Sequence, residues 1–254
     1  MTIDKEQRER YRVVSLDVDR VSHVSALDRV IDLVEAGRGA YICFGTVHMA
    51  MESFDSPAFA ARVNAAEMIV PDGMPMVWMQ KLQKAVDPER VRANDLMMLI
   101  MAEAERKGIR VGFYGGRPEV VERMVGRAGK EHPGLVVSFA YSPPFRPLTA
   151  DEDKEITDRI NASGTQILFM GLGCPKQENW MAEHRDRLNC VMLGVGASFD
   201  FYAGNVKESP AWLGRLGLEW LYRLVQEPKR LWRRYLVLNP RFIWHAGRQL
   251  LSQY

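Results

Sequence analysis

The sequence has few cysteines and no long apolar run. Its three cysteines lie far apart, at positions 43, 174 and 190, without a CxxC pair or the spacing of a metal site. This pattern excludes a disulfide framework and favours a reducing compartment, with each cysteine as a small buried residue. No stretch approaches the roughly 20 apolar residues of a membrane span. Residues 1–11 are charged, so we expect a cytoplasmic protein without a secretory signal.

A strong overall charge is also lacking, since the formal net charge is +2. The charges are nevertheless unevenly distributed. Residues 204–254 contain nine basic and three acidic residues, so this segment carries +6 and the rest of the chain carries −4. Such asymmetry indicates a partner surface or a ligand that carries phosphates.

Apolar runs alternate with helical patterns along the first 203 residues. We expect strands at residues 12–18, 40–45, 68–70, 109–114, 135–140, 166–170 and 190–195. Helices are expected at residues 25–36, 57–66, 75–83, 94–107, 118–131, 151–162 and 175–188. This alternation predicts the α/β class, with a Rossmann-like parallel sheet and helices on both faces. Residues 1–203 are therefore the expected catalytic domain.

The pattern changes near Gly204, and only helices are expected after it. One apolar stripe runs from Trp212 to Leu224, and a second helix after Pro228 interleaves apolar residues with arginines. Tryptophans beside arginines suit a membrane interface. A helical hairpin packed on the catalytic domain, with its basic face in water, explains the same pattern. The two interpretations are compatible, and both make residues 204–254 a helical appendage.

Asp72 follows a short apolar run and precedes an apolar helix, in the segment Ile69-Val70-Pro71-Asp72-Gly73-Met74-Pro75. Pro71 argues against continuation of the strand, and Gly73 permits a tight turn. Asp72 is therefore expected at the carboxyl end of a strand, where open α/β sheets place ligands. On this segment alone, an ordinary helix-capping role for Asp72 is the favoured interpretation.

Two strand-to-helix junctions are rich in glycine, namely Gly115-Gly116 before Pro118 and Gly171-Leu172-Gly173 before Pro175. Free amides at the start of a helix attract anions, and glycine lets a ligand approach the backbone. Neither junction is a Walker loop or a full GxGxxG, and glycine commonly forms such turns for geometric reasons. Gln177 and Glu178 follow in a first helical turn, where each either caps the helix or faces a ligand.

Other polar residues are expected near the same edge of the sheet. Thr46 and His48 follow the strand at residues 40–45, although a lone histidine is more often structural than catalytic. Arg90 is either a solvated loop charge or an anion clamp, and Asp95 complements a helix dipole. The segment at residues 17–19, Asp-Val-Asp, imitates a DxD metal motif but lacks further ligands. We expect no metal, so arginines would neutralise a diphosphate.

Five segments together are more specific than any single motif. They are Val70-Pro71-Asp72-Gly73 with Trp78, Arg90-Val91 with Asp95-Leu96, residues 171–178 (GLGCPKQE) with Trp180, residues 199–204 (FDFYAG), and residues 217–224 (GLEWLYRL) with Glu227-Pro228 and Arg230. These segments resemble the WecG/TagA/CpsF family of bacterial glycosyltransferases, and the resemblance extends from about Val14 to Phe242.

The resemblance implies an inverting, metal-independent enzyme without a cofactor, at the inner face of the cytoplasmic membrane. It would move a sugar from a UDP-sugar to a polyprenyl-diphosphate-linked saccharide during synthesis of a cell-surface or teichoic-acid-type polymer. By this likeness Asp72 is the general base. The implied substrate-binding residues are Thr46, His48, Arg90, Asp95, Gln177 and Asp200. The implied diphosphate- or nucleotide-binding residues are Gly115, Gly116, Gly171, Gly173, Arg223, Arg230 and Arg233. Assembly into a homo-oligomer is left open.

Three positions depart from the pattern of the family. His48 stands where a Thr-x-Asn motif is frequent, which indicates a different sugar. Ala93 stands where glycine is favoured. Glu208 stands where arginine is common, so it removes one expected positive charge.

Two other classes of function fit parts of the sequence. A Rossmann-type NAD(P) oxidoreductase needs a glycine fingerprint after an early strand, but residues 19–22 contain no glycine. A basic nucleic-acid-binding module accounts for the arginines and aromatic residues of the appendage. Those aromatic residues fall largely on apolar helical stripes, so we expect no nucleic-acid partner.

Overall fold

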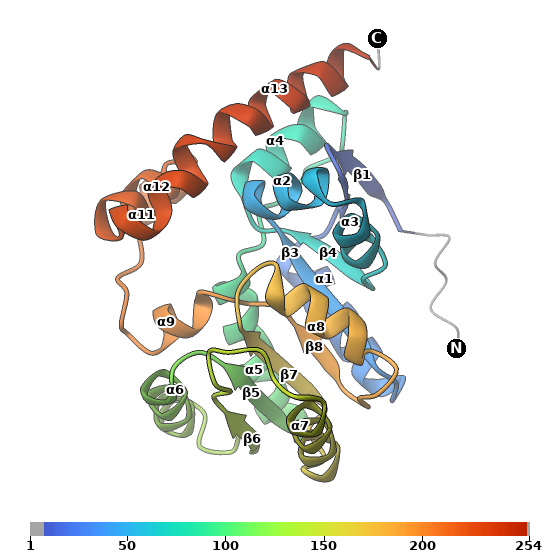
Figure 1. Cartoon of the computed structure of the whole chain (residues 1–254), viewed down its shortest axis with the longest axis vertical. Helices are drawn as coiled ribbons and strands as arrows, with labels where there is room; N and C mark the ends of the chain where they lie inside the picture. The colour runs from blue at the N-terminus through green and yellow to red at the C-terminus, as the bar shows by residue number, and fades with distance from the viewer. Residues whose placement is uncertain (1–7, 253–254) are drawn as a thin grey trace.

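The structure is a computed structural model that describes residues 8–252, and a six-stranded parallel sheet forms its centre (Figure 1). The strands lie side by side in the order β4-β3-β8-β7-β5-β6. The central strands are almost wholly apolar and buried on both faces, as expected for a parallel sheet. The strands are β3 (Ala40–Gly45), β4 (Met68–Pro71), β5 (Val111–Gly115), β6 (Val137–Tyr141), β7 (Ile167–Gly171) and β8 (Val191–Leu193).

Helices cover both faces of this sheet, which confirms the predicted Rossmann-like α/β class (Figure 1). Alternate residues of β3 enter the two cores, because Ile42 and Phe44 pack on one side and Tyr41 and Cys43 on the other. The first core is covered by α1 (His23–Glu35), α5 (Ala93–Lys107), α6 (Pro118–Glu131) and α9 (Ser198–Tyr202). The second is covered by α2 (Val47–Asp55), α3 (Pro57–Asn64), α4 (Met74–Leu82), α7 (Ala150–Ala162) and α8 (Lys176–His184).

The strand expected at residues 12–18 is instead an antiparallel hairpin of β1 (Arg10–Val13) and β2 (Leu16–Asp19). Val14 has a φ of 57°, so the chain reverses there. Asn64 stabilises the turn, because its side chain donates to the Ser15 carbonyl and accepts from the Asp17 amide, each at 2.9 Å. The Asp19 carboxylate is buried and held by arginine side chains of the same segment.

The sequence pattern does not predict α2 and α9. Thr46 caps α2 by accepting a hydrogen bond from the Met49 amide at 3.3 Å, so a helix begins directly after β3. Helix α8 ends at His184, before the expected end at residue 188. Pro71 is the last residue of β4 rather than lying beyond it, and it is opposite Gly45 of β3. A strand end tolerates proline because few ladder hydrogen bonds remain there.

Residues beyond Gly204 are helical, as predicted, but within the described part of the chain they form four helices rather than two. These are α10 (Ala211–Arg215), α11 (Glu219–Gln226), α12 (Pro228–Leu236) and α13 (Leu238–Leu251). Gly217 has a φ of 72° and interrupts the stripe expected between Trp212 and Leu224. Glycine adopts this left-handed conformation without the strain that a side chain causes.

The appendage packs against the sheet domain. Helix α13 lies along α2, where Phe242 and Ala246 enter the second core and the rings of His245 and Phe54 are 4.0 Å apart (Figure 1). A domain boundary between residues 203 and 204 stays a prediction. Among residues 8–252, no helix combines the length and the apolar character that crossing a bilayer requires.

Candidate active site

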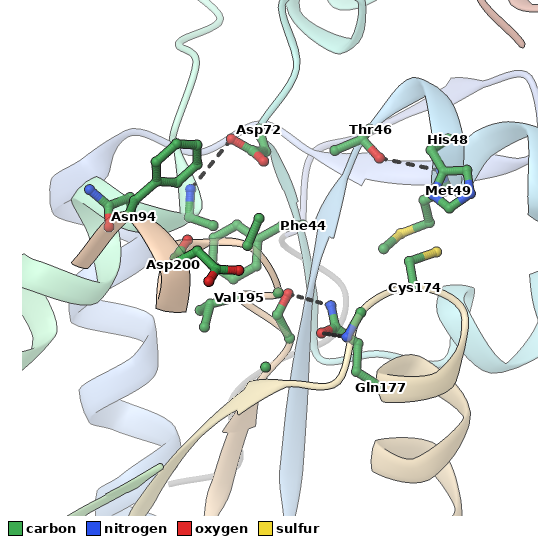
Figure 2. Close-up of a pocket in the computed structure, with 18 of the residues that line it drawn as sticks. Phe44, Thr46, His48, Met49, Asp72, Asn94, Cys174, Gln177, Val195 and Asp200 are labelled. Carbon is green, nitrogen blue, oxygen red and sulfur yellow. Dashed lines mark hydrogen bonds between the residues drawn. The ribbon is translucent and has the colours of Figure 1, made fainter. Parts of the chain in front are cut away.

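A polar cavity of about 450 Å³ lies at the carboxyl ends of β3, β4, β7 and β8 (Figure 2). Thr46 follows β3, Asp72 follows β4, and residues 172–174 and 194–198 follow β7 and β8. Parallel sheets bind ligands at this edge because their loops converge there. Figure 2 shows Asp72 and Thr46 on one side of the cavity and Gln177 on the other. Side chains from separated segments of the sequence therefore meet in one place, and Asp200 of α9 joins them.

Asp72 is held in place by its neighbours. Its amide donates to the Gly45 carbonyl at 3.2 Å, Arg90 Nε donates to its carbonyl, and the Ala93 amide donates to Oδ1 at 3.4 Å. Gly73, not Asp72, is the N-cap residue of α4, so Asp72 does not cap the helix that follows it. Its Oδ1 instead accepts from the first residue of α5. Burial raises the pKa of the Asp72 carboxyl, and Arg90 opposes this effect. The result is a carboxylate of increased basicity on the cavity wall.

Thr46 and His48 line the cavity from the start of α2. Because Thr46 Oγ1 accepts the capping hydrogen bond, its hydroxyl hydrogen is left for a ligand. Burial, with a smaller effect of Arg234, lowers the pKa of His48 to about 4, so its imidazole is neutral near pH 7. His48 Nε2 lies 3.4 Å from Glu52 Oε1, and its buried Nδ1 has no hydrogen-bond partner among the described residues.

Gln177 ties together the loops on the other side of the cavity. Its Nε2 donates to the Gly194 carbonyl at 2.7 Å and to Glu178 Oε1 at 2.8 Å, and its Oε1 accepts from the Gly173 amide at 3.0 Å. Both amide hydrogens are thus used within the protein, and one oxygen lone pair remains for a substrate. Glu178 is fully buried, and burial raises its pKa to about 7. Its Oε2 has no partner within residues 8–252.

The two glycine-rich junctions pack on each other. A Cβ on Gly115 would lie 2.6 Å from the Gly171 carbonyl carbon, and one on Gly171 would lie 2.4 Å from the Phe199 ring. Close packing alone therefore explains these two glycines. Gly171 and Gly173 line the polar cavity, whereas Gly115 and Gly116 lie behind Gly171 and are not part of its wall. A Cβ on Gly173 would meet open space, so a ligand can approach the backbone there.

A second cavity, of about 660 Å³, opens between α4 and the appendage and is mainly apolar. Its apolar wall includes Met74, Trp78, Leu82, Trp220, Tyr235, Leu236, Phe242, Ile243 and Leu250. The two cavities share part of their lining, namely Thr46, His48, Asp72, Glu219, Arg223 and Arg234. Asp72 therefore lies where a polar and an apolar cavity meet.

Ion pairs join the loop that begins at Arg90 to the appendage. Arg90 Nη2 lies 2.7 Å from Glu219 Oε2, and Arg92 Nη2 lies 2.9 Å from Glu208 Oε2. Arg90 lines the apolar cavity and Arg92 the polar one. Asp95 lines neither cavity, but its Oδ1 lies 3.3 Å from Nη1 of Arg92. These pairs hold the appendage close to Asp72.

The predicted arginines of the appendage are not equivalent. Arg223 and Arg230 line the polar cavity, whereas Arg233 is exposed and lines neither cavity. Arg234, which the sequence pattern does not single out, lines both cavities. The buried residues of α12 are Leu231 and Tyr235. At about 100° per residue, position 233 falls opposite them and position 234 falls beside them, so helical geometry distinguishes the two arginines.

Sequence reasoning also missed several residues of the cavity wall. Arg92, Asn94 and Glu219 line it, and the only signal for them was their place beside predicted motifs. Glu178 was noted in a first helical turn, but its complete burial could not be read from the sequence. Arg92 and Asn94 each donate to Glu208, and Glu219 accepts from Arg90. These partners lie far away in the chain, which explains why a local pattern does not reveal Arg92, Asn94 and Glu219.

The fold and the site define a Rossmann-like protein with two adjoining cavities, one of them at the carboxyl edge of its sheet. A family model described as "Glycosyl transferase WecG/TagA/CpsF family" matches residues 11–254, and the chain belongs to this family. It is thus a glycosyltransferase, and neither the oxidoreductase nor the nucleic-acid-binding interpretation is needed.

Curated relatives agree with this assignment. An N-acetylglucosaminyldiphosphoundecaprenol N-acetyl-beta-D-mannosaminyltransferase from Bacillus spizizenii is 31% identical over 229 residues, which cover 90% of this chain and 86% of that protein. A protein of the same name from Bacillus subtilis is 30% identical over 175 residues, which cover 68% of this chain and 66% of that protein.

Proposed function

We propose that this glycosyltransferase moves a sugar from a UDP-sugar to a saccharide on a polyprenyl diphosphate, with inversion and with Asp72 as general base. The observation that carries this proposal is the location of Asp72 at the junction of the polar and the apolar cavity. A general base must reach the acceptor hydroxyl while the anomeric carbon of the donor lies beside it. It therefore belongs where the two substrates meet.

The polar cavity suits the nucleotide diphosphate sugar. Residues of the first turns of α2 and α8 line it, namely His48, Met49, Gln177 and Glu178, and the N-terminus of a helix attracts phosphate. Arg223, Arg230 and Arg234 lie on the appendage side, where guanidinium groups can bind phosphate oxygens in pairs. On the sheet side, the Thr46 hydroxyl and the Asp200 carboxylate are available to hydroxyl groups of the sugar or ribose.

The apolar cavity suits the first units of a polyprenyl chain, because its wall is built from aliphatic and aromatic side chains. The printed names of the two Bacillus relatives describe an N-acetylglucosaminyl-diphospho-undecaprenol and an N-acetylmannosaminyl group that is transferred. They support an acceptor of the same kind for this chain. His48, which departs from the family pattern, lines the junction. A contact between His48 and the donor sugar would select a sugar different from the one used by relatives with asparagine there.

The reaction needs one proton transfer and one displacement. Asp72 takes the proton of the acceptor hydroxyl as that oxygen attacks the anomeric carbon from the face opposite UDP. A new carbon–oxygen bond forms, the bond from the anomeric carbon to the β-phosphate oxygen breaks, and UDP leaves with the electron pair. The arginines stabilise the charge that develops on the diphosphate. No group of three His, Cys, Asp or Glu side chains suited to a metal occurs among the described residues.

The appendage also suits contact with an anionic membrane surface. Its helices expose large apolar side chains, including Trp212 (60% exposed), Val225 (75%), Trp232 (52%), Ile243 (70%) and Trp244 (65%). Lys229, Arg233 and Arg248 are exposed on the same helices. Apolar side chains enter the interface and basic ones pair with headgroups, so this surface supports peripheral attachment to the inner face of the membrane.

Asp72→Asn tests the proposal. The amide keeps the size of the side chain but cannot take a proton, so we expect turnover to fall by about 10²- to 10⁴-fold while UDP still binds. Turnover is measured as UDP release from a panel of UDP-sugars with a lipid-linked acceptor. Asp151→Asn, at an exposed acid in the first turn of α7, is the control. A folded Asp72→Asn protein with wild-type turnover would overturn the role of Asp72.

A further inference from the structure

The Asp72 carboxylate has an arginine beside it but forms no ion pair with any residue that the structure describes. It accepts one hydrogen bond, from the Ala93 amide at 3.4 Å. Arg90 is bound to the same residue, because its Nε donates to the Asp72 carbonyl. The rest of that guanidinium is directed to the appendage, where Nη2 lies 2.7 Å from Glu219 Oε2. Arg92 Nε lies 3.7 Å from the same oxygen, so one carboxylate of α11 holds both cations.

Glu219 is ionised and largely enclosed. Burial would raise its pKa, but Arg90 and Arg92 outweigh burial, so the pKa of Glu219 lies below its ordinary value. Only 16% of the side chain is exposed, and charges in such places are weakly screened. Glu219 lines both cavities, as Asp72 does. A second negative charge therefore faces the space in which Asp72 would act.

Glu219 favours a basic Asp72 in two ways. Burial is the main cause that raises the pKa of Asp72, and the negative charge of Glu219 raises it further, whereas Arg90 and Arg92 lower it. Glu219 also occupies the guanidinium of Arg90. Without Glu219, Arg90 would be free to pair with the Asp72 carboxylate, and a carboxylate paired with a cation is a poorer base.

We propose that Glu219 is a positioning residue for the reaction, which draws Arg90 and Arg92 to itself and leaves the Asp72 carboxylate free to take a proton. This inference rests on the proposed function for the role of Asp72. It adds that the appendage supplies a negative charge to the site as well as cations. The site is therefore complete only when α11 is docked on the loop that begins at Arg90.

Other titratable and charged groups surround the same space and stay in place when Glu219 is changed. His48 is neutral near pH 7, and Glu178 titrates near pH 7 in every variant that keeps it. A change at Glu219 alone therefore isolates its own charge. The remaining groups that line the cavities are Cys174 at the start of α8, Asp200 of α9, Arg223 of α11, and Arg230 and Arg234 of α12.

The test uses the full chain with Glu219→Gln, which keeps the size of the side chain and an acceptor for Arg90 but removes the charge. The titration of Asp72 is followed by NMR of its carboxyl carbon, assigned with Asp72→Asn, and turnover is measured as UDP release over the same pH range. We expect the pKa of Asp72 to fall by about 0.5 to 1 unit. The acid limb of turnover should move to lower pH by the same amount, because Asp72 acts as a base only when ionised.

Glu219→Asp keeps the charge and should stay close to wild type. Glu219→Ala is a second neutral variant with the same expected direction as Glu219→Gln, should the glutamine variant not fold. Glu208→Gln is the matched control, because it breaks another ion pair between the appendage and the same loop, while Glu208 lines neither cavity. A looser appendage would affect both variants, so we expect the acid limb of Glu208→Gln to stay at the wild-type pH.

The inference is wrong if Asp72 titrates at the same pH in wild type and in the neutral variants at position 219. It is also wrong if Glu208→Gln moves the titration as far as Glu219→Gln does, because docking alone then explains the shift. If Glu219→Gln shifts the titration of Asp72 but Asp72→Asn keeps wild-type turnover, the proposed role of Asp72 as base fails while the electrostatic effect of Glu219 on Asp72 stands.

Discussion

Glu178 allows a quantitative test of the electrostatics at the cavity wall. The side chain is fully buried in the first turn of α8, where Oε1 accepts from Gln177 and Oε2 has no partner in the described part of the chain. Burial raises its pKa from an ordinary value of 4.5 to about 7. The folded protein therefore binds this proton more tightly than the unfolded chain does. Glu178→Gln places a neutral amide of the same shape at this position.

The sign of the effect follows from this raised pKa. Below pH 4.5 both states are protonated, so the wild-type protein has its full stability with respect to Glu178. Between pH 4.5 and pH 7 the unfolded chain ionises while the folded one keeps its proton, and the free energy of unfolding falls by about 1.4 kcal/mol per pH unit. The total loss is about 3 kcal/mol, and no further loss from this group occurs above pH 7. Glutamine does not titrate, so it escapes this loss.

We therefore expect Glu178→Gln to match wild type near pH 4.5 and to exceed it by up to about 3 kcal/mol at pH 8. The measurement is urea unfolding of both proteins at a series of pH values, because the difference between them cancels other titrating groups. Glu183→Gln, at an exposed carboxylate of the same helix, is the control and should show a nearly constant difference. A difference for Glu178→Gln that is the same at pH 5 and pH 8 would refute the reasoning.

Two further predictions concern the surface and the metal. Trp232→Ala should weaken binding to vesicles that contain anionic lipid while turnover with a detergent-soluble acceptor changes little, and Phe145→Ala, at an exposed aromatic residue outside the appendage, should change neither. Equal vesicle binding by wild type and Trp232→Ala would count against the membrane surface. Turnover should survive exhaustive chelation, because the arginines of the appendage supply the positive charge at the diphosphate. A loss that magnesium or manganese restores would contradict this expectation.

The sequence predicts the sheet better than the site. The strands and most helices of the first 203 residues follow from period and from capping residues, and the α/β class is confirmed. The errors lie where long-range contacts decide. The chain reverses at Val14 and forms a hairpin, because the Asn64 side chain of α3 donates a hydrogen bond to the Ser15 carbonyl in the turn. Gly217 interrupts an apolar stripe that otherwise reads as one helix.

The candidate site shows the same division. Asp72, Thr46 and Gln177 are predicted because each follows a strand, and strand ends converge at one edge of a parallel sheet. Period and spacing do not reveal which hydrogen bonds a side chain already makes. Gln177 uses both amide hydrogens inside the protein, so its remaining capacity for substrate is smaller than its position indicates. Gly115 is required because it packs closely against the backbone of Gly171, a contact that the local sequence pattern does not reveal.

The ion pairs in the structure show which charges of the appendage are available to a ligand. A net charge of +6 on residues 204–254 indicates phosphate, but it does not say which cations are available. Glu208 and Glu219 are two of the three acidic residues in that segment, and they pair with Arg92 and Arg90 of the sheet domain rather than with the appendage arginines. They thereby attach the appendage while leaving Arg223 without a carboxylate partner among the described residues. Glu208 therefore contributes to the attachment of the appendage through its ion pair with Arg92.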